Sequence, residues 1–337
     1  MTLDAVPAVS RVSFDVVERG QLIVPCPLVS RDRARSTSGA DANAAWLAVH
    51  AGVGPAALLV SWAVSSTSSG DVDAGEGELP PAAYVIETSA DSTDGSDGQW
   101  RRELSVEQNA ASARSHVIEF DGQSWVRLVL AAGARAPSFA RFDLHDASDG
   151  TDDCWLLWGD PVLASAGSAE PGEASWAAAI HERYPGYFPA LIDAASPNAS
   201  PVHGVERLQE LLEAHPAVRR VAIAYSPAVG AGVVADGAVE RDGDLDAIVA
   251  AVLEGGRLPV LARQPALPGA VPASVEAFNR RVASLEARHA LVRGPDLAAW
   301  FDAHPGQLDA EGRPTREGRA AIQRLWVDAL DLFYVPQ

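Results

Sequence analysis

The chain has 337 residues and a hydrophobic content of 47%, which suits two ordinary soluble domains with buried cores. Its formal net charge is −19, so a phosphate backbone would repel it, and we expect no nucleic-acid partner. No segment offers about 18 uninterrupted apolar residues, and the start has no basic stretch followed by an apolar run. We therefore expect a cytoplasmic protein that does not engage a membrane.

The two cysteines, Cys26 and Cys154, are too few and too far apart for a disulfide framework or a zinc site. We expect both to be buried as small apolar side chains. The sequence suggests no metal and no cofactor.

The first half of the chain alternates short apolar runs with clusters of Gly, Ser, Asp and Pro. Each run has the length of a strand and none keeps a helical period. The expected strands are Ala57–Val64, Ala83–Thr88, Ser115–Phe120, Trp125–Leu130 and Phe139–Leu144. The pattern is typical of an all-β sandwich, and we take 1–150 as its domain.

The pattern changes after Gly150, where strand-like runs begin to alternate with amphipathic segments. Strict alternation of this kind predicts a parallel sheet covered by helices on both faces. The expected strands are Cys154–Trp158, Val221–Tyr225, Pro259–Gln264 and a short one at Ala290–Val292. The expected helices are Gly204–His215, Leu245–Leu253, Val271–Arg288 and Arg316–Phe333. We take 151–337 as this second domain.

The segment 152–161 reads DDCWLLWGDP, a buried strand that runs into Gly-Asp-Pro. It resembles the first sequence block of the SGNH (GDSL-type) hydrolases, in which a strand ends in Gly-Asp-Ser and the serine is the nucleophile. Segments 189–194, 221–225, 256–263, 294–297 and 300–305 follow one bacterial branch of that superfamily in order. The resemblance implies a flavodoxin-type parallel sheet between helices.

The resemblance also extends to the first half. The run Tyr84–Ser92, followed by Trp100 and 125–128, is similar to the galactose-binding-like sandwich that precedes the hydrolase domain in that branch. A jelly-roll sandwich is therefore expected ahead of the α/β domain.

The blocks that carry chemistry in the family are altered in this chain. Pro161 stands where the family has its nucleophilic serine, and proline has neither a hydroxyl nor a backbone N–H. The family's Asp-x-x-His-Pro block matches 310–314, with Ala310 in place of the orienting carboxylate and Arg313 in place of the base. A guanidinium stays protonated and cannot accept the nucleophile's proton. The resemblance thus implies a scaffold without serine-hydrolase chemistry.

The former active-site mouth is a candidate binding cleft. If the correspondence holds, Asp160, Asn198, Tyr225, Ser226 and Arg313 converge there. Arg313 at the start of the last helix would favour an anionic group; an Arg313–Asp160 structural bridge is the alternative. Asn198 is either a surviving hydrogen-bond donor or a turn residue.

In the sandwich, Trp100, Trp125 and Arg127 are candidates for a carbohydrate platform. Alternating aromatic residues on strands are more often part of a core.

Loss of every catalytic block on a retained scaffold favours a noncatalytic protein that acts by binding, as an accessory or stabilising subunit of a bacterial enzyme complex. Its partner would be another protein or a second copy of itself, and a small anionic or carbohydrate ligand is compatible with the cleft. Two alternatives remain open: an enzyme with a non-esterase reaction in the remodelled cleft, and a carbohydrate-binding protein.

Overall fold

A computed structural model describes residues 10–11, 46–64, 80–111, 113–131, 139–148, 150–159, 176–185, 187, 189–194, 201–225, 244–267 and 272–334. By internal contacts the chain divides into two compact units. One comprises 1–8, 151–213 and 218–337, and the other comprises 9–150 and 214–217. Each unit is described by itself.

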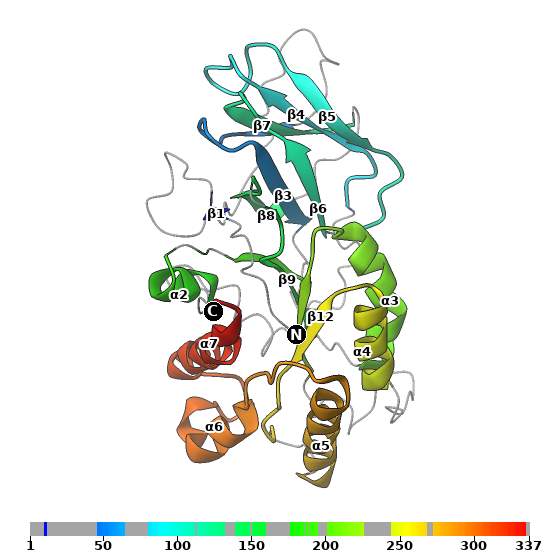
Figure 1. Cartoon of the computed structure of the whole chain (residues 1–337), viewed down its shortest axis with the longest axis vertical. Helices are drawn as coiled ribbons and strands as arrows, with labels where there is room; N and C mark the ends of the chain where they lie inside the picture. Colours follow the sequence, from blue (N-terminus) through cyan, green and yellow to red (C-terminus); the bar gives the residue numbers. More distant parts are fainter. Residues whose placement is uncertain are drawn as a thin grey trace. The chain divides into compact units, whose positions relative to one another are not determined.

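The second of these units contains two antiparallel sheets. One has the order β1-β8-β3-β6 and the other β2-β7-β4-β5. The strands are β1 (Ser10–Arg11), β2 (Trp46–His50), β3 (Ala57–Val64), β4 (Tyr84–Ser89), β5 (Arg101–Val106), β6 (Ala113–Glu119), β7 (Trp125–Leu130) and β8 (Phe139–Asp146). Figure 1 shows these strands in blue to green, the colours of the first half of the sequence.

One hydrophobic cluster joins the two antiparallel sheets. Trp62 on β3 meets Tyr84 on β4 edge to face, with ring centroids 5.2 Å apart, and Leu128 and Phe142 are enclosed in the same cluster. Every second residue of β3 and β8 belongs to this cluster, as expected for one face of a sheet, and the residues between them are buried as well.

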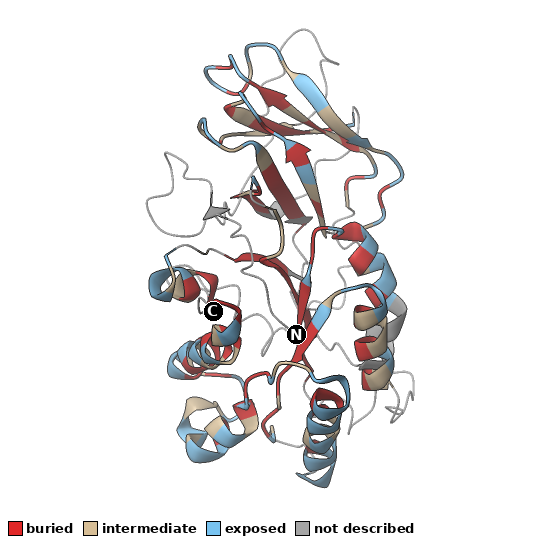
Figure 2. Cartoon of the chain, viewed as in Figure 1, coloured by how far each residue is buried: buried red, intermediate tan, exposed pale blue. Residues whose placement is uncertain are grey.

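The other unit is built on a parallel sheet of order β10-β9-β11-β12. Its strands are β9 (Cys154–Gly159), β10 (Ala190–Asp193), β11 (Arg220–Ala224) and β12 (Leu258–Leu261). Every residue of β9 and β11 is buried, as expected for central strands covered on both faces. In Figure 2, β9 and β11 are red, the colour of buried residues.

Helices cover both faces of the parallel sheet (Figure 1). On one face lie α2 (Trp176–Arg183), α6 (Leu297–Ala303) and α7 (Arg316–Leu330), and on the other lie α3 (Pro201–Ala214), α4 (Asp244–Glu254) and α5 (Pro272–His289). Two short 3-10 turns, η3 (Pro305–Gln307) and η4 (Asp331–Phe333), complete the unit. The fold-class prediction is confirmed: an all-β part precedes a parallel sheet between helices.

Helix α7 begins where the sequence places it. Thr315 caps it by accepting a hydrogen bond from the Gly318 backbone N–H, which satisfies one of the free donors of the first turn. Ile322, Trp326 and Leu330 are buried along one side, so the three- and four-residue spacing of the sequence corresponds to one buried stripe.

One predicted element is wrong. No strand forms at Ala290–Val292; Ala290 ends the turn after α5 with φ 51°, and a single bridge pairs Arg263 with Asp296. The Leu291 backbone N–H donates to the Glu286 carbonyl oxygen at the end of α5, so the helix end uses a group that a strand would offer to its neighbour. Further along, the buried carboxylate of Glu286 accepts a hydrogen bond from the Gly294 N–H.

Candidate functional site

The carboxyl ends of the parallel strands form the edge at which ligands bind in open α/β sheets. The order β10-β9-β11-β12 places β9 and β11 side by side, although the chain visits β10 between them. Chain direction across the sheet therefore reverses between these two strands, and such a switch point is the favoured place for a ligand. Of the predicted cleft residues, Asp160, Asn198 and Ser226 lie outside the described residues, as does Pro161.

Gly159 ends β9 at this edge and explains the glycine of the Gly-Asp motif. Its φ of 123° disfavours any side chain, and a Cβ built on it would lie 2.0 Å from the Ala224 carbonyl oxygen of β11. The two backbones therefore approach so closely that only glycine fits.

Arg313 is held by its own loop. Its Nε lies 3.1 Å from Asp309 Oδ2 and its Nη2 lies 3.2 Å from Glu311 Oε2, while its backbone N–H donates to Asp309 Oδ1. The side chain is 65% exposed. The hydrogen bond that Arg313 donates to Glu311 and the charge of Asp309 raise the pKa of Arg313 above its ordinary value. The loop thus keeps this group cationic at the position where the family resemblance implies a base, and Ala310 between the two acids is exposed.

Tyr225 follows β11 at the switch point and is 1% exposed. Its hydroxyl and the indole N–H of Trp158 on β9, which is 2% exposed, are both enclosed; the indole N–H approaches the hydroxyl, and neither atom has another partner. Burial raises the pKa of Tyr225 above its ordinary value, whereas the nearby Trp158 N–H and the charge of Arg207 lower it. Sequence analysis placed Tyr225 in the cleft but missed Trp158, although Trp158 directly precedes the Gly-Asp motif.

A third polar group, Gln264, lies three residues beyond the end of β12, the next strand along the sheet. Gln264 is fully buried; its Nε2 donates to the Ala262 carbonyl, but its Oε1 accepts nothing. Asn279 on α5 exchanges two hydrogen bonds of 2.9 Å with the Gln264 backbone. The same helix supplies Glu286, whose carboxylate pairs with Arg263. Sequence analysis gave no signal for this set, because isolated Gln, Asn and Glu residues have no diagnostic spacing.

Histidine is the usual general base of a hydrolase, and two histidines of this unit are engaged in local contacts. His181 Nδ1 lies 2.9 Å from the Tyr187 carbonyl oxygen. His304 Nδ1 lies 2.9 Å from the Trp300 carbonyl oxygen, and its ring stacks on the indole at 4.0 Å. The side chain of His203 lies outside the described residues.

One serine–histidine hydrogen bond occurs in the unit that contains the antiparallel sheets. Ser115 Oγ lies 3.1 Å from His215 Nδ1. Both residues are fully buried, and His215 Nε2 has no partner. Burial lowers the pKa of His215 to about 3, with smaller effects from His116 and Arg114. A pair that no substrate reaches and no carboxylate orients does not make a nucleophile.

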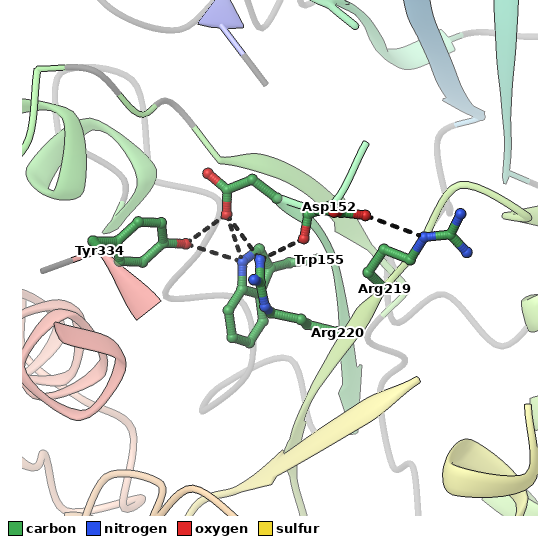
Figure 3. A network of polar contacts seen from close by, with 6 residues as sticks. Asp152, Trp155, Arg219, Arg220 and Tyr334 are labelled. Carbon is green, nitrogen blue, oxygen red and sulfur yellow. Dashed lines mark hydrogen bonds and ion pairs between the residues drawn. The ribbon is translucent and has the colours of Figure 1, made fainter. Parts of the chain in front are cut away.

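The amino end of the parallel sheet carries a buried polar network (Figure 3). Asp153 Oδ1 accepts hydrogen bonds from Tyr334 Oη at 2.7 Å and from Trp155 Nε1 at 3.2 Å. Arg220 Nη1 lies 3.3 Å from the same oxygen and donates to the Asp152 carbonyl. Burial raises the pKa of Asp153 to about 6, against the lowering effects of Tyr334, Arg220 and Trp155. Because α/β ligand sites lie at the other edge, we regard this network as structural.

Two of the three residues predicted to form a carbohydrate platform, Trp100 and Arg127, contact each other. The Arg127 guanidinium lies 3.9 Å from the ring centroid of Trp100 and pairs with Glu87 at 2.7 Å. Trp125 meets His50 at 5.0 Å. One face of Trp100 is thus occupied by Arg127, and Arg127 is paired on the neighbouring strand.

Within the described ranges, no group of three or more His, Cys, Asp or Glu residues is placed to hold a metal ion. Cys154 is a buried free thiol whose pKa burial raises; Cys26 lies outside those ranges. No helix among the same residues is long and apolar enough to cross a membrane.

No protein-family model matches this chain, and no curated protein matches it either. Several solved structures resemble it. TesA is 19% identical over 53% of this chain and 99% of its own, with a TM-score of 0.42. A catalytic mutant of Axe2, an acetylxylan esterase from Geobacillus stearothermophilus, is 15% identical over 55% and 96%, with a TM-score of 0.44. Protein YXIM from Bacillus subtilis is 13% identical over 86% and 80%, with a TM-score of 0.45. At these identities the likeness concerns the fold and not the chemistry.

Proposed function

We propose that this protein is a noncatalytic SGNH-hydrolase-like protein that acts by binding, as an accessory or stabilising subunit of an enzyme complex. The observation that carries the proposal is the state of Arg313, an exposed cation clamped by Asp309 and Glu311. Acyl transfer requires a group at this position that takes up and returns a proton. A guanidinium paired with two carboxylates does not.

The sequence supports the same conclusion at the nucleophile. Pro161 offers neither an attacking hydroxyl nor a backbone donor for an oxyanion. Both proton-handling groups of the reaction are thus replaced, by residues that are compatible with folding: Asp-Pro suits the start of a helix, and the Arg313 clamp stays on the surface.

A protein partner fits the charge better than a nucleic acid or an anionic surface does. The formal net charge of −19 favours a partner that presents a basic or neutral surface and speeds encounter with it at low ionic strength. We therefore expect association with a product of a neighbouring gene that weakens as salt is raised.

The test has a catalytic arm and a binding arm. The purified chain is assayed with p-nitrophenyl acetate and treated with a serine-directed phosphonate, and we expect neither turnover above buffer nor covalent labelling. The chain is then run by size exclusion with light scattering, alone and with co-expressed neighbouring gene products. Phosphonate-sensitive turnover would refute the loss of catalysis, and elution as a free monomer with every such product would refute the accessory role.

A further inference from the structure

The fully buried carboxyl group of Asp153 receives its hydrogen bonds on one oxygen only. The three donors of the network in Figure 3, Tyr334, Trp155 and Arg220, lie 2.7, 3.2 and 3.3 Å from its Oδ1. Among the described residues no group donates to Oδ2, which is nevertheless shielded from solvent. Arg220 offsets this deficit only in part, because its Nη1 also donates to the Asp152 carbonyl. An ionised carboxyl group spreads its charge over both oxygens, so this arrangement penalises ionisation.

The three donors differ in how firmly the backbone holds them. Trp155 on β9 and Arg220 on β11 pair in register in the middle of the parallel sheet, and each is also paired on its other side, with β10 and β12 respectively. Tyr334 follows the single turn η4, and its backbone N–H donates to the Asp331 carbonyl at 3.0 Å. Tyr334 is therefore the donor that withdraws from Asp153 at the least cost.

We propose that residues 331–334 form a pH-sensitive latch, which stays docked while Asp153 is protonated and opens more often once Asp153 is ionised. When Tyr334 withdraws, water reaches the carboxyl group, and an ionised group gains far more from that water than a protonated one does. Burial raises the pKa of Asp153 to about 6, so the docked latch binds this proton more tightly than the open latch. By linkage, the proton favours docking.

The other ionisable groups that face Asp153 keep one charge in mildly acidic and neutral solution. Burial and the charge of Asp153 raise the pKa of Tyr334 well above its ordinary value, and burial likewise raises the pKa of Cys154 on β9. Arg220 carries a guanidinium, which stays protonated in proteins. A change of docking between pH 5 and pH 8 would therefore follow Asp153.

Two further carboxylates near the latch lie towards the surface and have partners of their own. The half-exposed Asp152 pairs with Arg219 at 3.6 Å. Asp331, in the latch itself, accepts hydrogen bonds from Tyr184 Oη at 2.6 Å and from Arg183 Nη1 at 2.9 Å. The hydrogen bond from Tyr184 and that from Arg183 lower the pKa of Asp331, so this surface anchor stays ionised while Asp153 titrates.

The inference goes beyond the proposed accessory role and does not rest on it, since it concerns the motion of one segment and not a protein partner. Its test uses the full chain without a partner. Failure of the latch would leave the size-exclusion result unaffected, and the absence of a partner would leave the latch unaffected.

The first measurement is amide hydrogen exchange, resolved by residue in ¹⁵N spectra and corrected for the intrinsic rate at each pH. The Tyr334 amide, bonded to the Asp331 carbonyl, reports opening of the latch, and the amide of Trp326, buried within α7, reports unfolding of that helix. We expect Tyr334 to be less protected than Trp326 at every pH, because the latch opens while α7 stays folded. Its protection should fall about tenfold from pH 5 to pH 8.

The second measurement repeats the exchange with two matched carboxyl variants. Asp153→Asn cannot ionise, so the protection of Tyr334 should no longer depend on pH. Asp331→Asn weakens the surface anchor, whose charge is constant over this range, so protection should fall by a similar factor at every pH and keep the trend of the parent.

Tyr334→Phe keeps the proposal falsifiable if Asp153→Asn does not fold. The hydrogen bond from Tyr334 lowers the pKa of Asp153 against the larger effect of burial, so its loss should move the midpoint of the exchange profile at residue 334 to higher pH. Equal protection of Tyr334 and Trp326 in the parent would mean that the segment opens only when α7 unfolds. That result, a parent profile without a pH trend, a trend that survives in Asp153→Asn, or an unmoved midpoint in Tyr334→Phe would each overturn the proposal.

Discussion

The hydroxyl of Tyr334 donates a 2.7 Å hydrogen bond to the buried carboxylate of Asp153, which immediately precedes β9. Both residues are almost fully buried, and Trp155 Nε1 lies within hydrogen-bonding distance of each at 3.2 and 3.1 Å. These hydrogen bonds hold Tyr334, which follows η4, against the amino end of β9.

Removing this hydroxyl should destabilise the protein. Tyr334→Phe leaves the buried carboxylate with fewer donors, and we expect a loss of about 1–3 kcal/mol in the free energy of unfolding. Urea denaturation measures it. Tyr184→Phe, which deletes a less buried hydroxyl, should cost clearly less, and equal losses for the two variants would contradict the special role of Asp153.

Stability should fall as the pH rises past the pKa of Asp153. Burial raises the folded-state pKa to about 6 from an ordinary value of 3.8, so the folded protein binds this proton more tightly than the unfolded chain does. The stabilisation is complete below the unfolded value and is lost as the pH rises through about 6, a difference of roughly 3 kcal/mol at most. Denaturation between pH 4 and 7 measures the trend. Asp153→Asn should remove it, and a parent whose stability rises steadily over this range would contradict the prediction.

Gly159 should be intolerant of any side chain. Gly159→Ala combines a positive φ with a Cβ 2.0 Å from the Ala224 carbonyl oxygen, and we expect a loss of roughly 3 kcal/mol or more. Gly256→Ala is the matched control, because its φ is also positive, at 70°, but no atom lies within 4 Å of the added Cβ. The control should lose about 1 kcal/mol. Similar losses would mean that β9 and β11 do not approach as closely as the structure places them.

Introducing the groups that the proposed function takes to be replaced tests that proposal directly. The variant Pro161→Ser with Ala310→Asp and Arg313→His supplies a hydroxyl, a carboxylate and an imidazole at the corresponding positions. We expect p-nitrophenyl acetate turnover above the parent, sensitive to a phosphonate. The matched variant that keeps Pro161 but carries the other two changes should remain inactive, and turnover by that variant would mean that the attacking group lies elsewhere.

Much of the architecture was predictable because it is encoded locally. Short apolar runs between clusters of Gly, Ser, Asp and Pro predicted the antiparallel strands, and the alternation of strand and helix predicted the parallel sheet. The spacing of Ile322, Trp326 and Leu330 predicted the stripe buried by α7. The same reasoning missed β5, whose residues Arg101–Val106 are mostly exposed or half-buried and show little hydrophobic pattern. It also placed a strand at Ala290–Val292, where the Leu291 N–H instead donates to the Glu286 carbonyl oxygen at the end of α5.

The sequence alone determined which chemical groups are present: a proline and an arginine at positions where the resemblance implies a hydroxyl and a base, two cysteines and an excess of acids. Only the tertiary structure decided which groups meet. It paired Arg313 with Asp309 and Glu311, laid Arg127 over Trp100, and brought the enclosed Trp158 and Tyr225 together at the end of β9 and β11. Local patterns record periodicity along one segment, whereas burial and partnership depend on strands and helices distant in the chain.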